Sequence, residues 1–255
     1  MTEKDCFEKI KELAYLAGKK MREADRSEMT TDAKTGHQNF VTKYDKAIEQ
    51  YLREELKKIF PEAAFFGEET ANGDFPDTEY VFVVDPIDGT SNFIKDLRWS
   101  CVAIALTKQK ERICGMVYNP YTEELFSAVK GEGAFLNDVP IRVSPEPLER
   151  GIAVFGTAPY YDDIRGLAMK KAEEYLEKCI DIRRTGSAEL DLCLVAAGRA
   201  ELYFEPRIQP WDFAAGSLIV EEAGGRVCRW DGTPLDVTKA SDCMACGSGV
   251  KIRRL

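Results

Sequence analysis

The chain has 255 residues, with 35 Lys and Arg against 44 Asp and Glu and a formal net charge of −9. Such a length can form one large domain or two small ones around a real hydrophobic core. The acidic balance and the lack of a long basic tract argue against direct nucleic-acid binding, because phosphate backbones select clustered Lys and Arg. An anionic substrate is compatible with this charge, since a bound divalent cation can reverse the local sign.

No segment of the chain predicts export or membrane association. Residues 1–5 are charged and lack the apolar stretch of a signal peptide, and no run of about 18 apolar residues predicts a transmembrane helix. We therefore expect a cytoplasmic protein without a membrane partner. The eight cysteines are then expected to be reduced core residues, and Cys243-Met244-Ala245-Cys246 lacks the second pair that would support a metal or redox site.

His37 is the only histidine of the chain and lies in a polar segment that we expect to be a solvated loop. With His37 in such a loop we expect no Ser-His-Asp triad, and a single histidine cannot supply a zinc site built on two histidines or a phosphohistidine pair. Carboxylates must therefore carry the acid–base or metal chemistry.

Periodicity predicts the elements of the N-terminal part in chain order. Apolar residues at helical spacing predict a helix over 3–25 and a second helix over 44–59, with a polar loop over 27–40 between them. Short apolar runs predict strands over 80–84, 101–107, 113–118 and 125–129. We expect these strands to form an antiparallel sheet packed on the two helices.

Ser144-Pro145-Glu146-Pro147 interrupts this pattern and marks a predicted boundary between residues 1–144 and residues 145–255. Beyond it, strands and helices alternate. The predicted strands cover 151–156, 180–184, 200–204, 226–230 and 243–247, and the predicted helices cover 161–178, 187–197 and 213–223. The predicted fold class is α+β followed by α/β, in layers of helix and sheet.

The segment Asp85-Pro86-Ile87-Asp88-Gly89-Thr90 is the most informative part of the sequence. It follows an apolar run that predicts a buried strand, which would bring two carboxylates to its C-terminal end with a proline-set turn between them. Gly89 lets the backbone approach a ligand closely, and Thr90 supplies a hydroxyl group. Carboxylates gathered at a strand end hold hard cations such as Mg²⁺ when these also bind phosphate. The segment therefore predicts a metal-dependent, phosphate-processing site.

Two further acidic segments are candidates for the same site. Glu68 and Glu69 follow the pair Phe65-Phe66, and Asp212 stands at the predicted N-cap of the helix over 213–223. Each has a simpler structural explanation when taken alone: a solvated loop for the glutamates and a helix cap worth about 1 kcal/mol for Asp212.

Longer motifs carry a resemblance to a known family. Gly67-Glu68-Glu69, residues 85–93, residues 211–216 and residues 222–225 resemble the inositol monophosphatase family, and residues 40–45, 186–188 and 193–198 extend the likeness. The resemblance covers nearly the whole chain, with the motifs in the same order. It implies a layered αβαβα sandwich of the sugar-phosphatase type, a homodimer, and Mg²⁺-dependent, lithium-sensitive hydrolysis of small phosphate monoesters.

The same resemblance implies the metal ligands. Glu68, Asp85 and the Ile87 carbonyl would hold a first Mg²⁺, and Asp85, Asp88 and Asp212 would hold a second, with Asp85 bridging the two ions. A third, weaker ion is implied near Glu68, which gives two to three ions per subunit.

The resemblance also implies the catalytic residues Asp45, Glu68 and Thr90. Asp45 would hydrogen-bond Thr90, and this pair together with Glu68 would orient the attacking water. Two metals about 3.5–4 Å apart would neutralise charge, lower the pKa of a bound water and stabilise the departing alkoxide. Direct attack by water would invert the configuration at phosphorus. Lys34 is either part of a mobile segment near the third ion or a loop residue without a catalytic task.

The implied substrate contacts are Asp88, Gly89, Thr90, Ser187, Ala188, Glu205 and Arg207. Glu205 matches a carboxylate that in the family hydrogen-bonds sugar or inositol hydroxyls, and Ser187 and Ala188 would line the same pocket. Arg207 has three alternatives: a salt bridge with Glu205, a contact with a partner subunit, or a contact with a second phosphate. Glu189 is a further acidic residue that would repel bisphosphates.

The first functional hypothesis is Mg²⁺-dependent hydrolysis of a small polyol phosphate monoester, with inositol 1-phosphate as the leading substrate, by direct attack of a metal-activated water. The enzyme alternatives are fructose-1,6-bisphosphatase, histidinol-phosphatase and 3′-phosphoadenosine-5′-phosphate phosphatase. The alternative without catalysis is a partner-binding protein in a transcription complex. The presence of all the implied acidic ligands favours the enzyme, because a protein that had lost catalysis would be expected to lack at least one of them.

Overall fold

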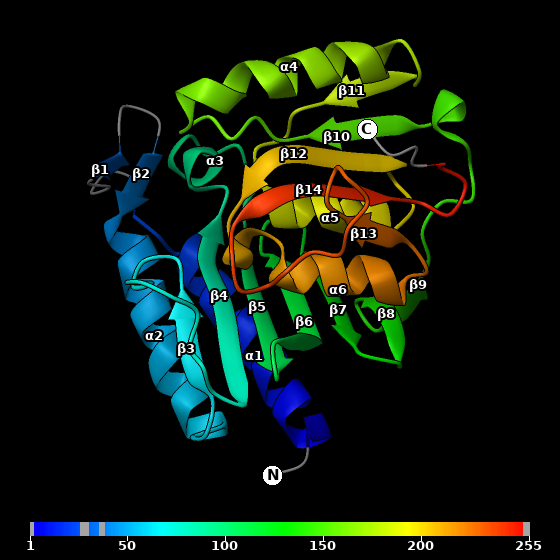
Figure 1. Cartoon of the computed structure of the whole chain (residues 1–255). Helices are drawn as coiled ribbons and strands as arrows, with labels where there is room; N and C mark the ends of the chain where they lie inside the picture. Colours follow the sequence, from blue (N-terminus) through cyan, green and yellow to red (C-terminus); the bar gives the residue numbers. More distant parts are fainter. Residues whose placement is uncertain (1–2, 26–30, 36–38, 252–255) are drawn as a thin grey trace.

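Two sheets separated by helices organise the part of the chain that the structure describes. The computed structural model describes residues 3–25, 31–35 and 39–251. Its layers follow one another in the order two helices, seven-stranded sheet, two helices, five-stranded sheet and one helix (Figure 1). This order confirms the predicted layered αβαβα sandwich.

The first outer layer consists of helices α1 (Glu3–Arg22) and α2 (Lys43–Ile59). Ile10, Ala14 and Ala17 recur at helical spacing along α1 and are buried, which is why the helix packs on the sheet. Helix α2 begins with a capping box, in which the Thr42 hydroxyl accepts from the Asp45 N–H and the Asp45 carboxylate accepts from the Thr42 N–H at 2.8 Å. The start of α2 therefore fixes the position of Asp45.

The seven-stranded sheet has the strand order β3-β4-β5-β6-β7-β8-β9. The strands are β3 (Ala64–Gly67), β4 (Tyr80–Asp88), β5 (Cys101–Lys108), β6 (Glu111–Asn119), β7 (Glu124–Val129), β8 (Gly133–Leu136) and β9 (Val139–Ile141). β3 runs parallel to β4, and every other pair is antiparallel. The parallel pair brings the ends of β3 and β4 to one edge, so Glu68 follows β3 close to where β4 carries Asp85 and Asp88.

The five-stranded sheet has the order β11-β10-β12-β14-β13. The strands are β10 (Ile152–Phe155), β11 (Asp181–Arg183), β12 (Leu202–Ile208), β13 (Arg226–Cys228) and β14 (Ser241–Cys246). β10 is parallel to β11 and β12, whereas β14 is antiparallel to β12 and β13. Helix α4 (Asp162–Leu176) covers its outer face.

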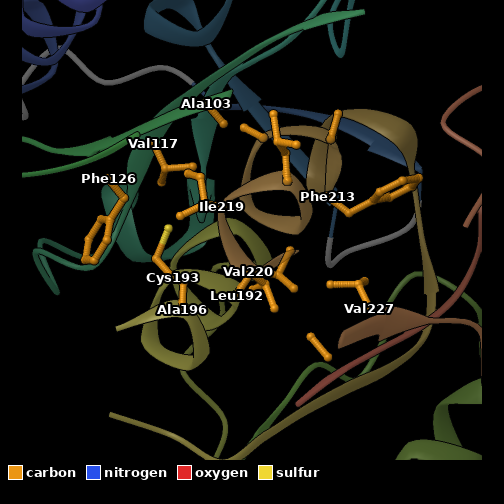
Figure 2. Packing of buried hydrophobic residues seen from close by; sticks show 14 of the residues in the cluster. Ala103, Val117, Phe126, Leu192, Cys193, Ala196, Phe213, Ile219, Val220 and Val227 are labelled. Carbon is orange, nitrogen blue, oxygen red and sulfur yellow. The ribbon is translucent and has the colours of Figure 1, made fainter. Parts of the chain in front are cut away.

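Helices α5 (Ala188–Ala196) and α6 (Ala214–Glu222) fill the space between the two sheets. Figure 2 shows Cys193 of α5 and Ile219 of α6 on the side of Val117 and Phe126 of the seven-stranded sheet, whereas Leu192 of α5 lies beside Val220 of α6. The contact between α6 and β6 is close, because a Cβ on Gly115 would lie 2.7 Å from the Ala215 carbonyl oxygen. One hydrophobic cluster thus joins both predicted parts of the chain.

Most predicted elements are confirmed, and the differences have identifiable causes. Residues 27–40 were expected to form a loop, but β1 (Thr31–Thr35) and β2 (Asn39–Thr42) pair there as an antiparallel hairpin. β3, β8 and β9 were not predicted because each has only three or four residues, too few to show a period of two. Lys34 lies in β1, but its side chain is outside the described part, as is His37.

The expected turn between Asp85 and Asp88 is wrong. β4 continues through Asp88, and a bulge in its pairing with β5 lies between the two aspartates, so that Asp85 is opposite Ala103 and Asp88 is opposite Cys101. A bulge re-aims side chains along a strand. Both carboxylates therefore belong to the strand and not to a loop beyond it.

The strands of the seven-stranded sheet all precede residue 145, and those of the five-stranded sheet all follow it. The division into parts 1–144 and 145–255 stays a prediction, since the hydrophobic cluster around α5 and α6 includes residues from both. All eight cysteines have free thiols, and all but Cys179 are buried. In the described ranges, no helix has the length and apolar character needed to cross a bilayer.

Substituting Gly115 with Ala tests the close packing of α6 on β6. The new methyl group would meet backbone atoms that cannot rotate away, so we expect Gly115→Ala to lower the free energy of unfolding by about 1–3 kcal/mol. Gly166→Ala is the matched control, because this helical position has no neighbour within 4 Å and alanine should add about 0.5–1 kcal/mol of stability. Urea denaturation of both variants measures the two changes; equal effects would contradict the packing.

Candidate active site

One cavity of about 240 Å³ gathers most of the predicted site residues. Its lining includes Glu68, Asp85, Ile87, Asp88, Gly89, Thr90, Ser187, Ala188, Glu205, Arg207 and Asp212. These residues come from β3–β4, from the start of α5, from β12 and from the segment before α6. The fold therefore brings together acidic residues that are more than a hundred positions apart in the sequence. Asp45 does not line the cavity, but its carboxylate accepts a hydrogen bond from the lining residue Thr90.

The segment after Asp85 is shaped by local hydrogen bonds. The Asp85 carboxylate accepts from the Ile87 N–H at 2.9 Å, which fixes the bulge. Gly89 has a φ of 86° and begins the short helix α3 (Thr90–Ile94). A Cβ at this left-handed position would also lie 3.0 Å from the Trp99 carbonyl oxygen, so glycine is required both for conformation and for space.

The predicted hydrogen bond between Thr90 and Asp45 is present. The Thr90 hydroxyl lies 3.1 Å from Asp45 Oδ1 and also 3.1 Å from the Ile87 carbonyl oxygen, so its single proton is shared between two acceptors. Burial raises the pKa of Asp45, and the hydrogen bonds from Thr42 partly oppose this rise. The hydroxyl oxygen of Thr90 keeps its own acceptor capacity toward the cavity.

Asp88 is held by the first residues of α5. Its Oδ2 accepts from the Ser187 hydroxyl at 2.5 Å and from the Glu189 N–H at 2.8 Å, and its Oδ1 accepts from the Ala188 N–H at 3.3 Å. The Cys101 thiol lies 3.7 Å from Oδ2. Burial raises the pKa of Asp88 to about 6 in spite of these donors. The hydroxyl of Ser187, expected to contact substrate, is thus bonded to Asp88.

Asp212 lines the cavity but does not cap α6, which corrects the expectation from the sequence. It ends a short 3₁₀ helix (Pro210–Asp212), where its carboxylate accepts from the Gln209 N–H at 2.7 Å. The N–H groups of Ala215 and Gly216, in the first turn of α6, donate instead to the Glu189 carboxylate, at 3.1 and 2.5 Å. Burial raises the pKa of Asp212 well above its usual range, and the charge of Glu68 adds to the effect.

Glu189 is fully buried and does not line the cavity. Both of its oxygens accept hydrogen bonds from α6. The expectation that Glu189 would repel bisphosphates is therefore wrong, because the side chain faces a helix end and not the substrate.

Glu205 lies in β12 with both carboxylate oxygens already bonded. Oε1 accepts from the Ala158 N–H at 2.9 Å, and Oε2 accepts from the Tyr203 hydroxyl at 2.8 Å. Burial raises the pKa of Glu205 to about 7. Arg207, two residues further on, is exposed and makes no ion pair with Glu205; its guanidinium group lies 4.3 Å from the centre of the Tyr161 ring. The salt bridge between Arg207 and Glu205, one of the three alternatives for this arginine, is thereby excluded.

The cavity lining also includes residues that were not predicted from the sequence as site residues, among them Tyr160, Tyr161, Arg184 and Asp191. The two tyrosines follow β10, and Arg184 follows β11, which is parallel to β10. Ligands gather at the carboxyl ends of parallel strands, so strand ends were the available signal. This signal can be read only when the order of the strands in the sheet is known, and the sequence does not give that order.

The chemistry of the cavity fits a hard divalent cation. Its carboxylates supply oxygen ligands of the kind that Mg²⁺ prefers, and the Ile87 carbonyl is a further oxygen at the same place. Burial and mutual repulsion raise the pKa of Asp88 and of Asp212, which indicates unneutralised negative charge. Within the described residues, no three Asp, Glu, His or Cys side chains already form a complete metal-ligand group. The cavity therefore fits Mg²⁺ by the oxygen donors that it gathers.

Glu205 should give the metal-free protein a measurable pH dependence. Its pKa is about 7 in the folded chain and about 4.3 in an unfolded one, so the folded state holds the extra proton. The associated stability is present below about pH 4 and is lost as the pH rises through 7. In EDTA, the free energy of unfolding should fall between pH 5 and pH 8, and Glu205→Gln should reduce that fall by about 1–3 kcal/mol.

Urea denaturation at several pH values measures this difference. Glu62→Gln, which removes an exposed carboxylate, is the control and should follow the wild-type profile. Parallel profiles for wild type and Glu205→Gln would contradict the burial of a protonated Glu205.

Comparison with known proteins identifies the family of the chain. Residues 3–252 match the inositol monophosphatase family. The chain is 41% identical over 209 residues to Nus factor SuhB of Pasteurella multocida, covering 81% of this chain and 78% of the relative. It is 39% identical over 242 residues to inositol monophosphatase 2 of Solanum lycopersicum, covering 91% of each.

Two solved structures share the fold. The suhB protein of Bartonella henselae superposes with a TM-score of 0.87 at 34% identity, covering 94% of this chain and 93% of that one. An IMPase/NADP phosphatase complexed with Mg²⁺ and phosphate gives a TM-score of 0.81 at 26% identity, covering 94% and 88%. The motifs, the fold and these likenesses agree, and the chain belongs to the inositol monophosphatase family.

Proposed function

We propose that this protein is a Mg²⁺-dependent phosphatase that hydrolyses small polyol phosphate monoesters, with inositol 1-phosphate as the first substrate to test. The observation that carries the proposal is the shared cavity, in which carboxylates from four separate segments lie beside the Thr90–Asp45 pair. The family membership supports the reaction class, and a related phosphatase binds Mg²⁺ and phosphate in a solved structure.

In this proposal Glu68, Asp85, Asp88 and Asp212 hold the metal together with the Ile87 carbonyl. Bound Mg²⁺, in two to three ions per subunit, would neutralise the charge of the phosphate dianion and make a water molecule more acidic. Asp85 and Asp88 are buried, and Glu68 and Asp212 are partly buried, so that solvent screens the charge of these carboxylates less than it would at the surface.

The protein's own groups position the water and the phosphate. The Thr90 proton is directed at Asp45 and at the Ile87 carbonyl oxygen, so the hydroxyl oxygen is available to accept a hydrogen bond from the attacking water. Asp45 is fixed by the capping box of α2 and keeps Thr90 in this orientation. The backbone N–H groups of Gly89 and Thr90 would donate to phosphate oxygens. Because water attacks directly, the configuration at phosphorus inverts.

The remaining family features belong to the same proposal: a homodimer, sensitivity to lithium and a cytoplasmic location. The alternative substrates are fructose 1,6-bisphosphate, histidinol phosphate and 3′-phosphoadenosine 5′-phosphate. A partner-binding role in a transcription complex is a second candidate, supported by the likeness to Nus factor SuhB. The complete acidic set favours catalysis, and partner binding in addition to catalysis is compatible with it.

Asp85→Asn tests the metal and the reaction together. Removing the central charge should lower kcat on the preferred substrate at least ~10³-fold with Mg²⁺ present. The measurement is phosphate release from inositol 1-phosphate and the three alternative substrates, with Mg²⁺ and with EDTA. Asp74→Asn, which changes an exposed aspartate in a loop, is the matched control and should keep wild-type activity.

Two outcomes of this assay would contradict the proposal. Near wild-type activity of Asp85→Asn would refute the assignment of Asp85, and phosphate release that is unchanged in EDTA would refute the need for a metal. If the wild-type protein releases no phosphate from any of these substrates in the presence of Mg²⁺, the partner-binding role would be favoured.

A further inference from the structure

Helix α2 carries a second buried carboxylate one turn after Asp45. Glu49 is four residues further along the helix, so its side chain lies on the same face as that of Asp45. Only 1% of Glu49 is exposed. Asp45 accepts from Thr90 at the cavity, whereas the hydrolysis described above gives Glu49 no task. A buried carboxylate is costly unless hydrogen bonds satisfy it, so the groups that bind Glu49 indicate what it does.

The Glu49 carboxylate binds the segment that directly follows Glu68. Its Oε2 accepts from the Glu69 N–H at 2.7 Å, and its Oε1 accepts from the Thr70 hydroxyl at 2.5 Å. On the other side, the Glu68 N–H donates to the Val84 carbonyl oxygen of β4 at 3.1 Å. The backbone around Glu68 is thus held by β4 before this residue's side chain and by α2 after it.

Arg53, one turn after Glu49, completes the attachment of α2 to this segment. Its guanidinium group donates to the Thr70 hydroxyl oxygen, and its Nη2 lies 3.9 Å from Glu49 Oε1. The same guanidinium group lies over the Phe65 ring, 4.7 Å from its centre. The Thr70 hydroxyl therefore donates to the carboxylate and accepts from the arginine. These contacts order Arg53 and place a positive charge beside the buried Glu49.

Gly67 leaves the space that the Glu49 carboxylate occupies. A Cβ at this position would lie 2.5 Å from Glu49 Oε2 and 2.5 Å from Phe65 Cε1. Gly67 ends β3, so the carboxylate contacts the backbone where the chain leaves the sheet. The glycine that precedes Glu68 is therefore explained by the close approach of α2.

We propose that Glu49 is a positioning residue for metal binding, which holds Glu68 in place through the Glu69 N–H and the Thr70 hydroxyl. The inference rests on the proposed function, since it takes Glu68 as a ligand of Mg²⁺. Groups that orient a ligand raise metal affinity, because the ligand loses less conformational freedom when the ion binds. Helix α2 thereby fixes two parts of the site, one through Asp45 and one through Glu49.

Mg²⁺ titration of variants tests this role without a measurement of activity. In Glu49→Ala the segment after Glu68 loses both bonds, and the Kd for Mg²⁺ in isothermal titration should rise at least about tenfold. Glu49→Gln keeps an oxygen for the Glu69 N–H and should stay within about threefold of wild type. Glu54→Ala is the matched control, because Glu54 is exposed on the same helix and should leave the Kd unchanged.

A double-mutant cycle assigns the effect to Glu68. In a Glu68→Gln background, where this ligand is already weakened, Glu49→Ala should change the Kd less than about twofold. Hydrogen exchange in EDTA gives a second readout, since the Glu69 amide should exchange at least about tenfold faster in Glu49→Ala than in wild type. Thr70→Val removes one of the two bonds at an exposed residue and should raise the Kd about threefold, which keeps the test available if Glu49→Ala does not fold.

The failures are distinguishable. An unchanged Kd in folded Glu49→Ala and in Thr70→Val would overturn the role of Glu49 and leave the proposed function in place. A rise of equal size in the wild-type and Glu68→Gln backgrounds would do the same, because Glu49 would then not act through Glu68. Absence of Mg²⁺ binding by the wild-type protein would overturn the proposed function and this inference with it.

Discussion

The bonding of Asp88 to the first turn of α5 is the contact on which the site depends. Asp88 belongs to the seven-stranded sheet, and three of its donors, from Ser187, Ala188 and Glu189, lie about a hundred residues later in the chain. A carboxylate at a helix N-terminus is favoured by the free N–H groups and by the helix dipole. These hydrogen bonds position α5 relative to β4. Helix α5 is followed by β12, which carries Glu205 and Arg207, and Glu189 within α5 binds the start of α6 beside Asp212.

The same arrangement concentrates negative charge in the interior. Glu189 at α6, Asp88 at α5 and Glu205 in β12 are all buried, and burial raises the pKa of each. Helix N-termini and backbone N–H groups satisfy some of the oxygens, but they do not neutralise the set. A divalent cation bound at the acidic end of the cavity would balance part of this charge, and it would allow a protein with a net charge of −9 to accept an anionic substrate.

Long periodic segments of the sequence were sufficient to predict most of the helices and strands. The layered fold and the acidic residues of the cavity were predicted from the resemblance of the motifs around Glu68, Asp85 and Asp212 to a known family. The sequence was insufficient where a neighbour far along the chain decides the structure. Asp212 has the sequence position of a helix cap, yet the cap of α6 is Glu189, which only the packing of α5 against α6 reveals. Arg184 and Tyr161 enter the cavity through the order of the strands, and short strands such as β3 form only because a longer neighbour pairs with them.

Isothermal titration with Mg²⁺ of wild type, Ser187→Ala and Ser91→Ala tests most directly whether the contact between Asp88 and α5 builds the site. Ser187 donates to Asp88, whereas Ser91 is an exposed residue of α3 at the same cavity. Partners that orient a metal ligand typically change metal affinity 10–100-fold. The account predicts that Ser187→Ala raises the Kd for Mg²⁺ at least tenfold and that Ser91→Ala changes it less than threefold. Equal Kd values for Ser187→Ala and wild type, with both proteins folded, would contradict it.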